Sequence, residues 1–192
     1  KGYNSNGTPS FWGLDKDARL RLWPEESPLM KPGALISPVD QRWFATQTWF
    51  DNEPIDGGTK ILPNIYYHSG LDIGGSERQV RVIAATDAVV VSAGDDVLPE
   101  YLLEGGARSH YGVGKSPVAP RSDVVYLRDE RGWYYRYSHL HEINDAIRPG
   151  RTIDQGTEIG LLGKKGSSGG WSHLHFEIKC RQPSGKWGTQ AG

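Results

Sequence analysis

Glycine and proline occur along the whole chain, and this feature restricts the fold more than any other. The 192 residues include 25 glycines and 12 prolines. Both residues interrupt helices and favour turns, so a helical bundle or a coiled coil is excluded. Hydrophobic residues make up only 36% of the chain, but 7 Trp and 9 Tyr are present, so large aromatic side chains must supply much of the core.

Short stretches with strand-like patterns follow one another from residue 61 onward and predict an all-β fold. The expected strand pairs are residues 80–84 with 88–92, 123–128 with 133–138, and 158–162 with 173–180. The fold class that follows is a β-dominated, antiparallel sheet or sandwich with long loops lining a groove.

We divide the chain into three parts. Residues 1–60 are rich in proline, tryptophan and polar groups and are expected to form an N-terminal extension that packs on the core. Residues 61–183 form the main domain, and residues 184–192 are expected to be a C-terminal tail. Within the main domain, residues 94–122 form a long loop, and loops of this length usually carry function.

Charge and hydropathy exclude several classes of protein. The formal net charge is −1, with the 22 basic residues scattered, so a nucleic-acid surface is not expected. No apolar stretch approaches the roughly 20 residues that span a bilayer. The chain begins at Lys1 rather than at a methionine, which leaves room for a leader or anchor removed from a longer precursor.

Five of the six histidines fall into three short clusters, and the first cluster runs from His68 to Asp72. Gly70 and the glycines that follow argue against a helix, and on a straight strand the two side chains would be about 13 Å apart. The glycines therefore predict a bent backbone that brings imidazole and carboxylate together. These two groups are a normal partial ligand set for zinc, although the isolated pattern is a weak signal.

The second cluster alternates along one predicted strand. One face carries Leu174, Phe176, Ile178 and Cys180, and the other carries His173, His175, Glu177 and Lys179. The two histidines are about 6.6 Å apart at the backbone, so one ring can bind a metal while the other contacts its bound water. Two solvated histidines on a sheet face remain the alternative. The glycine-rich run at residues 166–170 favours a site.

The third cluster, Tyr135 to His141, also alternates in sequence, which places Tyr135, Tyr137, His139 and His141 on one face. His139 is a candidate acid or base because two other histidine clusters accompany it. His141 lies beyond the expected strand end, and a plain surface role for it stays open. His110, in the long loop, is expected at the surface.

Taken in order, His68-x-x-x-Asp72, Tyr137-Ser-His-Leu140 and His173-Leu-His-Phe-Glu177 resemble the motifs of the lysostaphin-type (LytM-like) zinc metallopeptidases. The resemblance covers roughly residues 64–180 and includes Pro149-Gly150 and the segment 155–160. Residues 61–183 would then be a LytM-like metallopeptidase domain.

This resemblance implies one zinc ion per chain, held by His68, Asp72 and His175 with a fourth position open. His139 and His173 would be the catalytic residues beside the metal. The implied reaction is hydrolysis of a peptide bond by a zinc-activated water. We favour His173 as the base and His139 as the stabiliser of the oxyanion, and the reverse assignment stays open.

The resemblance also implies that the substrate is a peptidoglycan peptide, in a stem or a cross-bridge, and that the protein acts outside the cytoplasmic membrane, secreted, periplasmic or attached to the wall. One alternative is a non-catalytic LytM-like module that binds wall peptides or regulates another hydrolase. The presence of all five motif residues argues against that reading. A second alternative is a metallopeptidase that acts on other peptides.

Two sequence features bear on the substrate. Candidate groove aromatics are Tyr66, Tyr67, Tyr135, Tyr137 and Trp171, each of which can equally be an ordinary residue of a sheet face. Residues 117–122 replace the glycine-rich entry to the next strand that is usual in the family, which puts the choice of substrate in doubt.

Overall fold

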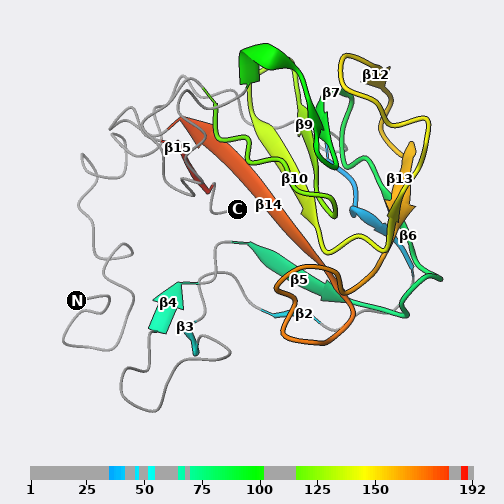
Figure 1. Ribbon diagram of the computed structural model, residues 1–192, viewed down its shortest axis with the longest axis vertical. Helices are drawn as coiled ribbons and strands as arrows, with labels where there is room; N and C mark the ends of the chain where they lie inside the picture. The colour runs from blue at the N-terminus through cyan, green and yellow to red at the C-terminus, as the bar shows by residue number, and fades with distance from the viewer. Residues whose placement is uncertain are drawn as a thin grey trace.

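Strands dominate the computed structural model of the protein. It describes residues 35–41, 46–47, 52–54, 65–67, 70–101, 116–181 and 187–189. Across these ranges the helical content is one 3₁₀ turn, η1 (Pro99–Tyr101), and no helix there has the length and apolar character needed to cross a membrane. The all-β fold class is therefore confirmed, and Figure 1 shows the strands as two main groups.

The larger sheet is antiparallel and contains the candidate site. In spatial order its strands are β12 (Thr152–Ile153), β7 (Ala88–Ala93), β9 (Val125–Arg128), β10 (Tyr134–Ser138), β14 (His173–Arg181), β5 (Leu71–Gly74) and β2 (Thr46–Gln47). Two further strands join it, with β8 (Asp96–Val97) pairing with β7 and β15 (Trp187–Thr189) pairing with β14. The nine-residue strand β14 lies near the middle of this order (Figure 1).

The smaller sheet has the order β1 (Val39–Asp40), β6 (Arg81–Ile83), β13 (Glu158–Leu161) and β11 (Glu142–Ile143). A separate pair is formed by β3 (Asn52–Pro54) and β4 (Ile65–Tyr67). Residues before position 61 thus contribute β1 to the smaller sheet and β2 to the larger one.

The main hydrophobic core joins the two sheets. Val82 of β6 and Ile159 of β13 belong to the same buried cluster as Tyr137 of β10 and Leu174 of β14. A second cluster contains residues that alternate along the strands with those of the main core, such as Val91, Tyr126 and Tyr134, together with Val118, Val124 and Trp187. Because side chains alternate along a strand, this second cluster packs on the other face of the larger sheet.

One predicted hairpin is confirmed and two predicted strand pairs are wrong. Strands β9 and β10 form the hairpin expected at residues 123–138. In contrast, β6 lies in the smaller sheet and β7 in the larger one, and β13 and β14 are divided in the same way. The short connections therefore carry the chain from one sheet to the other. Apolar patterning identifies a strand but does not specify its partner.

Candidate active site

Three neighbouring strands of the larger sheet carry the candidate residues. In the pairing of β5 with β14, Asp72 lies directly opposite His175. On the other side of β14, Ser138 of β10 is the register partner of the same histidine, and His139 follows Ser138. His173 precedes His175 by two residues and so shares its face. The sheet register thus gathers four of the five predicted site residues.

The fifth predicted residue, His68, lies outside the described residues. A bend at Gly70 separates β4 from β5, so the chain changes direction close to the first motif.

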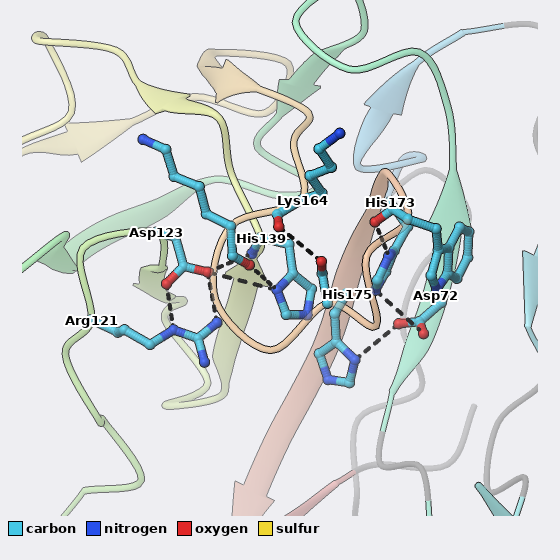
Figure 2. Close-up of polar contacts among 10 residues, drawn as sticks. Asp72, Arg121, Asp123, His139, Lys164, His173 and His175 are labelled. Carbon is cyan, nitrogen blue, oxygen red and sulfur yellow. Dashed lines mark hydrogen bonds and ion pairs between the residues drawn. The ribbon is translucent and has the colours of Figure 1, made fainter. Parts of the chain in front are cut away.

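Asp72 is the centre of the described site. Its Oδ1 lies 3.0 Å from Nδ1 of His175, and its Oδ2 lies 3.5 Å from Nε2 of His173. All three side chains are buried. Figure 2 shows the carboxylate of Asp72 between the two imidazoles of β14.

The Asp72–His175 pair fits one zinc ion. Bonds of 2.0–2.2 Å to nitrogen and oxygen in a tetrahedral site place two donor atoms about 3.4 Å apart. The observed separation of 3.0 Å needs only a small movement to meet this value. The described residues contain no group of three or more His, Cys, Asp or Glu side chains arranged to hold a metal, which agrees with His68 lying outside them.

Glu177 lies behind His175 and was not predicted as part of the site. Its Oε2 is 3.8 Å from Nε2 of His175. Burial alone would raise the pKa of Glu177, but His175 and Lys179 outweigh burial and hold that pKa well below its usual range. Two carboxylates thus flank the ring of His175, with Asp72 in hydrogen-bond contact on the Nδ1 side and Glu177 on the Nε2 side. With a metal on Nδ1, the ionised Glu177 would favour the proton on Nε2.

The polar face of β14 is buried rather than solvated. The predicted alternation is confirmed, because Leu174, Phe176 and Ile178 belong to the main core cluster. However, Glu177 and Lys179 on the opposite face are only 2% and 4% exposed. Arg136 of β10 adds a second cation, with Nη1 3.2 Å from Oε2 of Glu177. The residue types alone did not predict that these charged side chains are buried.

His139 departs from the predicted strand parity. It has φ of 69°, in the left-handed region, and β10 ends one residue earlier at Ser138. This turn reverses the alternation, so that Tyr137 and Leu140 both belong to the core while His139 joins the site. The ring centroid of His139 lies 4.7 Å from that of His173. The expectation that His139 shares a face with Tyr135 and Tyr137 is therefore wrong.

The loop between β13 and β14 supplies a carbonyl to each of these two histidines. Nδ1 of His139 donates to the carbonyl oxygen of Lys165 at 2.7 Å, and Nδ1 of His173 lies 3.2 Å from the carbonyl oxygen of Trp171. A carbonyl only accepts hydrogen bonds, so each contact favours a proton on Nδ1. Burial lowers the pKa of His139 to about 3, and the Lys165 bond offsets part of that effect. The His139 ring is therefore neutral near pH 7.

Of the predicted groove aromatics, Trp171 has an exposed side chain. It is 39% exposed and stacks on His173 with ring centroids 4.0 Å apart. Tyr135 and Tyr137 are fully buried in the core, so their assignment to a groove is wrong. The side chains of Tyr66 and Tyr67 lie outside the described residues, as does His110. His141 is partly exposed and lies 3.8 Å from Glu77.

Comparison with known families matches the three histidine clusters and the strands that carry them. The sequence profile of Peptidase family M23 matches residues 66–186, which is more than half of the chain. The chain belongs to peptidase family M23. This result confirms the family that the order of the motifs predicted, and membership of a peptidase family indicates hydrolysis of peptide bonds.

Solved structures similar to this M23 chain include a chain of the complex of SpoIIIAH and SpoIIQ, with 20% identity and a TM-score of 0.52 over 81% of this chain and 95% of that one. The catalytic domain of the antimicrobial peptidase lysostaphin from Staphylococcus simulans has 22% identity and a TM-score of 0.48 over 74% of this chain and 86% of that domain. A zinc-containing peptidase from Vibrio cholerae has 21% identity and a TM-score of 0.45, over 73% of this chain and 35% of that protein. The M23 chain spans 46% of the whole of lysostaphin.

Proposed function

We propose that this M23 chain is a zinc-dependent endopeptidase that hydrolyses peptide bonds of bacterial peptidoglycan outside the cytoplasmic membrane. The observation that carries this proposal is the 3.0 Å contact between Nδ1 of His175 and Oδ1 of Asp72, beside two further imidazoles. Family membership and the likeness of the motifs to those of lysostaphin-type enzymes support the wall peptide as substrate.

His68, Asp72 and His175 would hold the zinc ion in this proposal. Bound zinc supplies a Lewis acid and lowers the pKa of a coordinated water. The buried carboxylate of Glu177 lies on the Nε2 side of His175 and would favour the proton there, which leaves Nδ1 for the metal.

The hydrogen bonds support a division of labour between the two remaining histidines. His139 is neutral and carries its proton on Nδ1, so Nε2 has the lone pair that can accept a proton. Both ring nitrogens of His173 face oxygen atoms, of Trp171 and Asp72, an arrangement that suits a donor. These tautomers assign proton acceptance to His139 and donation to the oxyanion to His173, the reverse of the order favoured from sequence. Burial opposes this assignment in part, because it lowers the pKa of His139 and so weakens it as a base.

Mass spectrometry of fragments released from purified peptidoglycan, with and without a chelator, tests the proposal. Release of peptide fragments that stops on chelation and returns with zinc is the expected result. Binding to the wall without release of fragments would instead identify a non-catalytic module. Cleavage of a generic protein with no cleavage of peptidoglycan would identify a different substrate class.

A further inference from the structure

Asp123, just before β9, is a buried carboxylate that contacts the site and lies outside the three histidine motifs. It is 2% exposed. Arg121 binds it with two donors, as Nη2 lies 2.7 Å from Oδ2 and Nε donates to Oδ1. Figure 2 shows this pair beside His139, on the side away from Asp72. Burial alone would raise the pKa of Asp123, but the Arg121 guanidinium outweighs it and lowers the pKa, so the carboxylate is ionised.

Asp123 fixes the main chain of the turn that delivers His139. Its Oδ2 accepts the backbone N–H of His139 at 3.1 Å, and its own carbonyl accepts the backbone N–H of Leu140 at 3.1 Å. The left-handed conformation of His139 is unfavourable for a residue with a side chain. Two successive amides tied to one buried residue hold that conformation in place.

The same carboxylate also lies close to the ring of His139. Oδ2 of Asp123 lies 3.7 Å from Nδ1, whose hydrogen bond goes to the carbonyl of Lys165. The next residue, Gly166, packs directly on the ion pair, because a Cβ there would lie 2.9 Å from Nη2 of Arg121 and 3.0 Å from Oδ2 of Asp123. The ion pair is therefore the surface against which the carbonyl-bearing loop rests.

We propose that the Arg121–Asp123 pair positions His139, setting both its left-handed backbone and the proton on Nδ1 that leaves Nε2 available to the reaction. This proposal rests on the proposed function, because the fixed backbone and tautomer of His139 matter only if His139 accepts a proton in the reaction. Residues 117–122 replace the glycine-rich entry that is usual in the family. In this proposal their role is to supply Arg121, which binds Asp123.

The chain contains a matched control for this pair. Asp129, at the other end of β9, is 4% exposed and is bound by Arg131 two residues away, at 2.5 Å from Nη2 to Oδ2. It also accepts a backbone N–H, that of Trp133, at 2.9 Å. The two aspartates therefore have the same kind of partners and burial, but only Asp123 contacts a site histidine among the described residues.

The experiment compares Asp123→Asn, Arg121→Gln and Asp129→Asn with the wild type. Three quantities are measured: the zinc content, kcat and KM with purified wall peptides as substrate, and the ¹⁵N chemical shifts of the His139 ring. The variant His139→Gln identifies the ring signals. For Asp123→Asn we expect kcat to fall about 10- to 100-fold with KM and zinc content unchanged, and the His139 ring to populate both tautomers. Arg121→Gln, at a partly exposed position, should show a smaller change of the same kind.

Asp129→Asn should lower stability while kcat and the ring shifts stay at the wild-type values. Wild-type kcat and ring shifts in both Asp123→Asn and Arg121→Gln would overturn the proposal, and so would an equal fall of kcat in Asp129→Asn. If the wild type releases no wall peptide, the proposed function fails. The ring shifts, which need no substrate, still decide whether the pair orders His139.

Discussion

The imidazole of His175 occupies the space that a side chain at Gly70 would need. A Cβ atom at position 70 would lie 2.8 Å from both Cε1 and Nε2 of His175 and 2.9 Å from the carbonyl oxygen of Phe176. Because the backbone oxygen cannot move without disturbing β14, the imidazole must yield. The glycine of the first motif is thus required for the close approach of the last motif.

Gly70→Ala should therefore displace His175 and weaken zinc binding by at least about tenfold, with a loss of stability of about 1–3 kcal/mol from overpacking. Titration with a competing zinc chelator measures the affinity. Gly156→Ala is the control, because Gly156 has φ of 84° but has Ile36 as its nearest contact, at 4.0 Å. It should cost stability through strain and keep wild-type zinc affinity, and equal affinities in the two variants would contradict the steric argument.

The two histidines of β14 should separate metal binding from turnover. His175→Ala removes the nitrogen that faces Asp72, so zinc and activity should be lost together. His173→Ala should keep its zinc and lose about 10²- to 10⁴-fold in kcat, because its partners are a carbonyl and a stacked indole besides Asp72. Metal analysis of the two purified variants decides the matter, and equal zinc contents would show that the division of roles is wrong.

Glu177→Gln tests whether the carboxylate on the Nε2 side of His175 affects metal binding at Nδ1. A neutral amide no longer favours the proton on Nε2, so zinc affinity should fall about 10- to 100-fold even though no proposed ligand is changed. Lys179→Met is the matched control, because it removes another buried partner of Glu177 without changing the carboxylate. Both variants should unfold more easily, and chelator competition should find weakened zinc binding in Glu177→Gln alone.

Stability of the zinc-free protein should depend on the protonation of His139. Its pKa is about 3 in the folded chain against an ordinary value of 6.5, so below pH 6.5 the unfolded chain binds the proton more tightly. The free energy of unfolding should therefore fall by up to about 1.4 kcal/mol per pH unit between pH 6.5 and 3, and this contribution is absent above that range. Denaturant titrations of the zinc-free wild type and His139→Gln at several pH values measure the free energy of unfolding. The same pH dependence in both proteins would refute the prediction.

Removal of zinc should inactivate the protein without unfolding it. The main core cluster is built from apolar and aromatic side chains of both sheets, and Asp72 and His175 do not belong to it. Circular dichroism and thermal unfolding of the chelated protein should therefore show a folded chain. A large loss of strand signal on chelation would mean that the metal organises the fold as well as the reaction.

The sequence was most informative where a pattern is local. The β9–β10 hairpin surrounds a turn that is readable in the sequence, and the alternation in β14 separates Leu174 from His173 and His175 correctly. The partners of β6 and β13 could not be read in this way, because each strand is short, with one or two buried residues that either sheet would cover.

The environment of the site was harder to predict, for a related reason. The position of His139 depends on one backbone conformation, which a strand pattern assumes to be extended. That conformation is stabilised by Asp123, which lies 16 positions before His139 in the sequence. The buried Glu177 is paired with Arg136 of a neighbouring strand. None of these partners is adjacent in sequence to the motif that it serves.

The strand order has a consequence for how a newly made chain acquires its metal centre. Asp72 and His175 are 103 positions apart, yet they are direct neighbours across β5 and β14. During synthesis β5 leaves the ribosome about 100 residues before β14, so the pair closes only after β14 has been made. Fragments that stop short of β14 hold at most half of this pair, so a truncated chain lacks the contact on which the proposed metal centre depends.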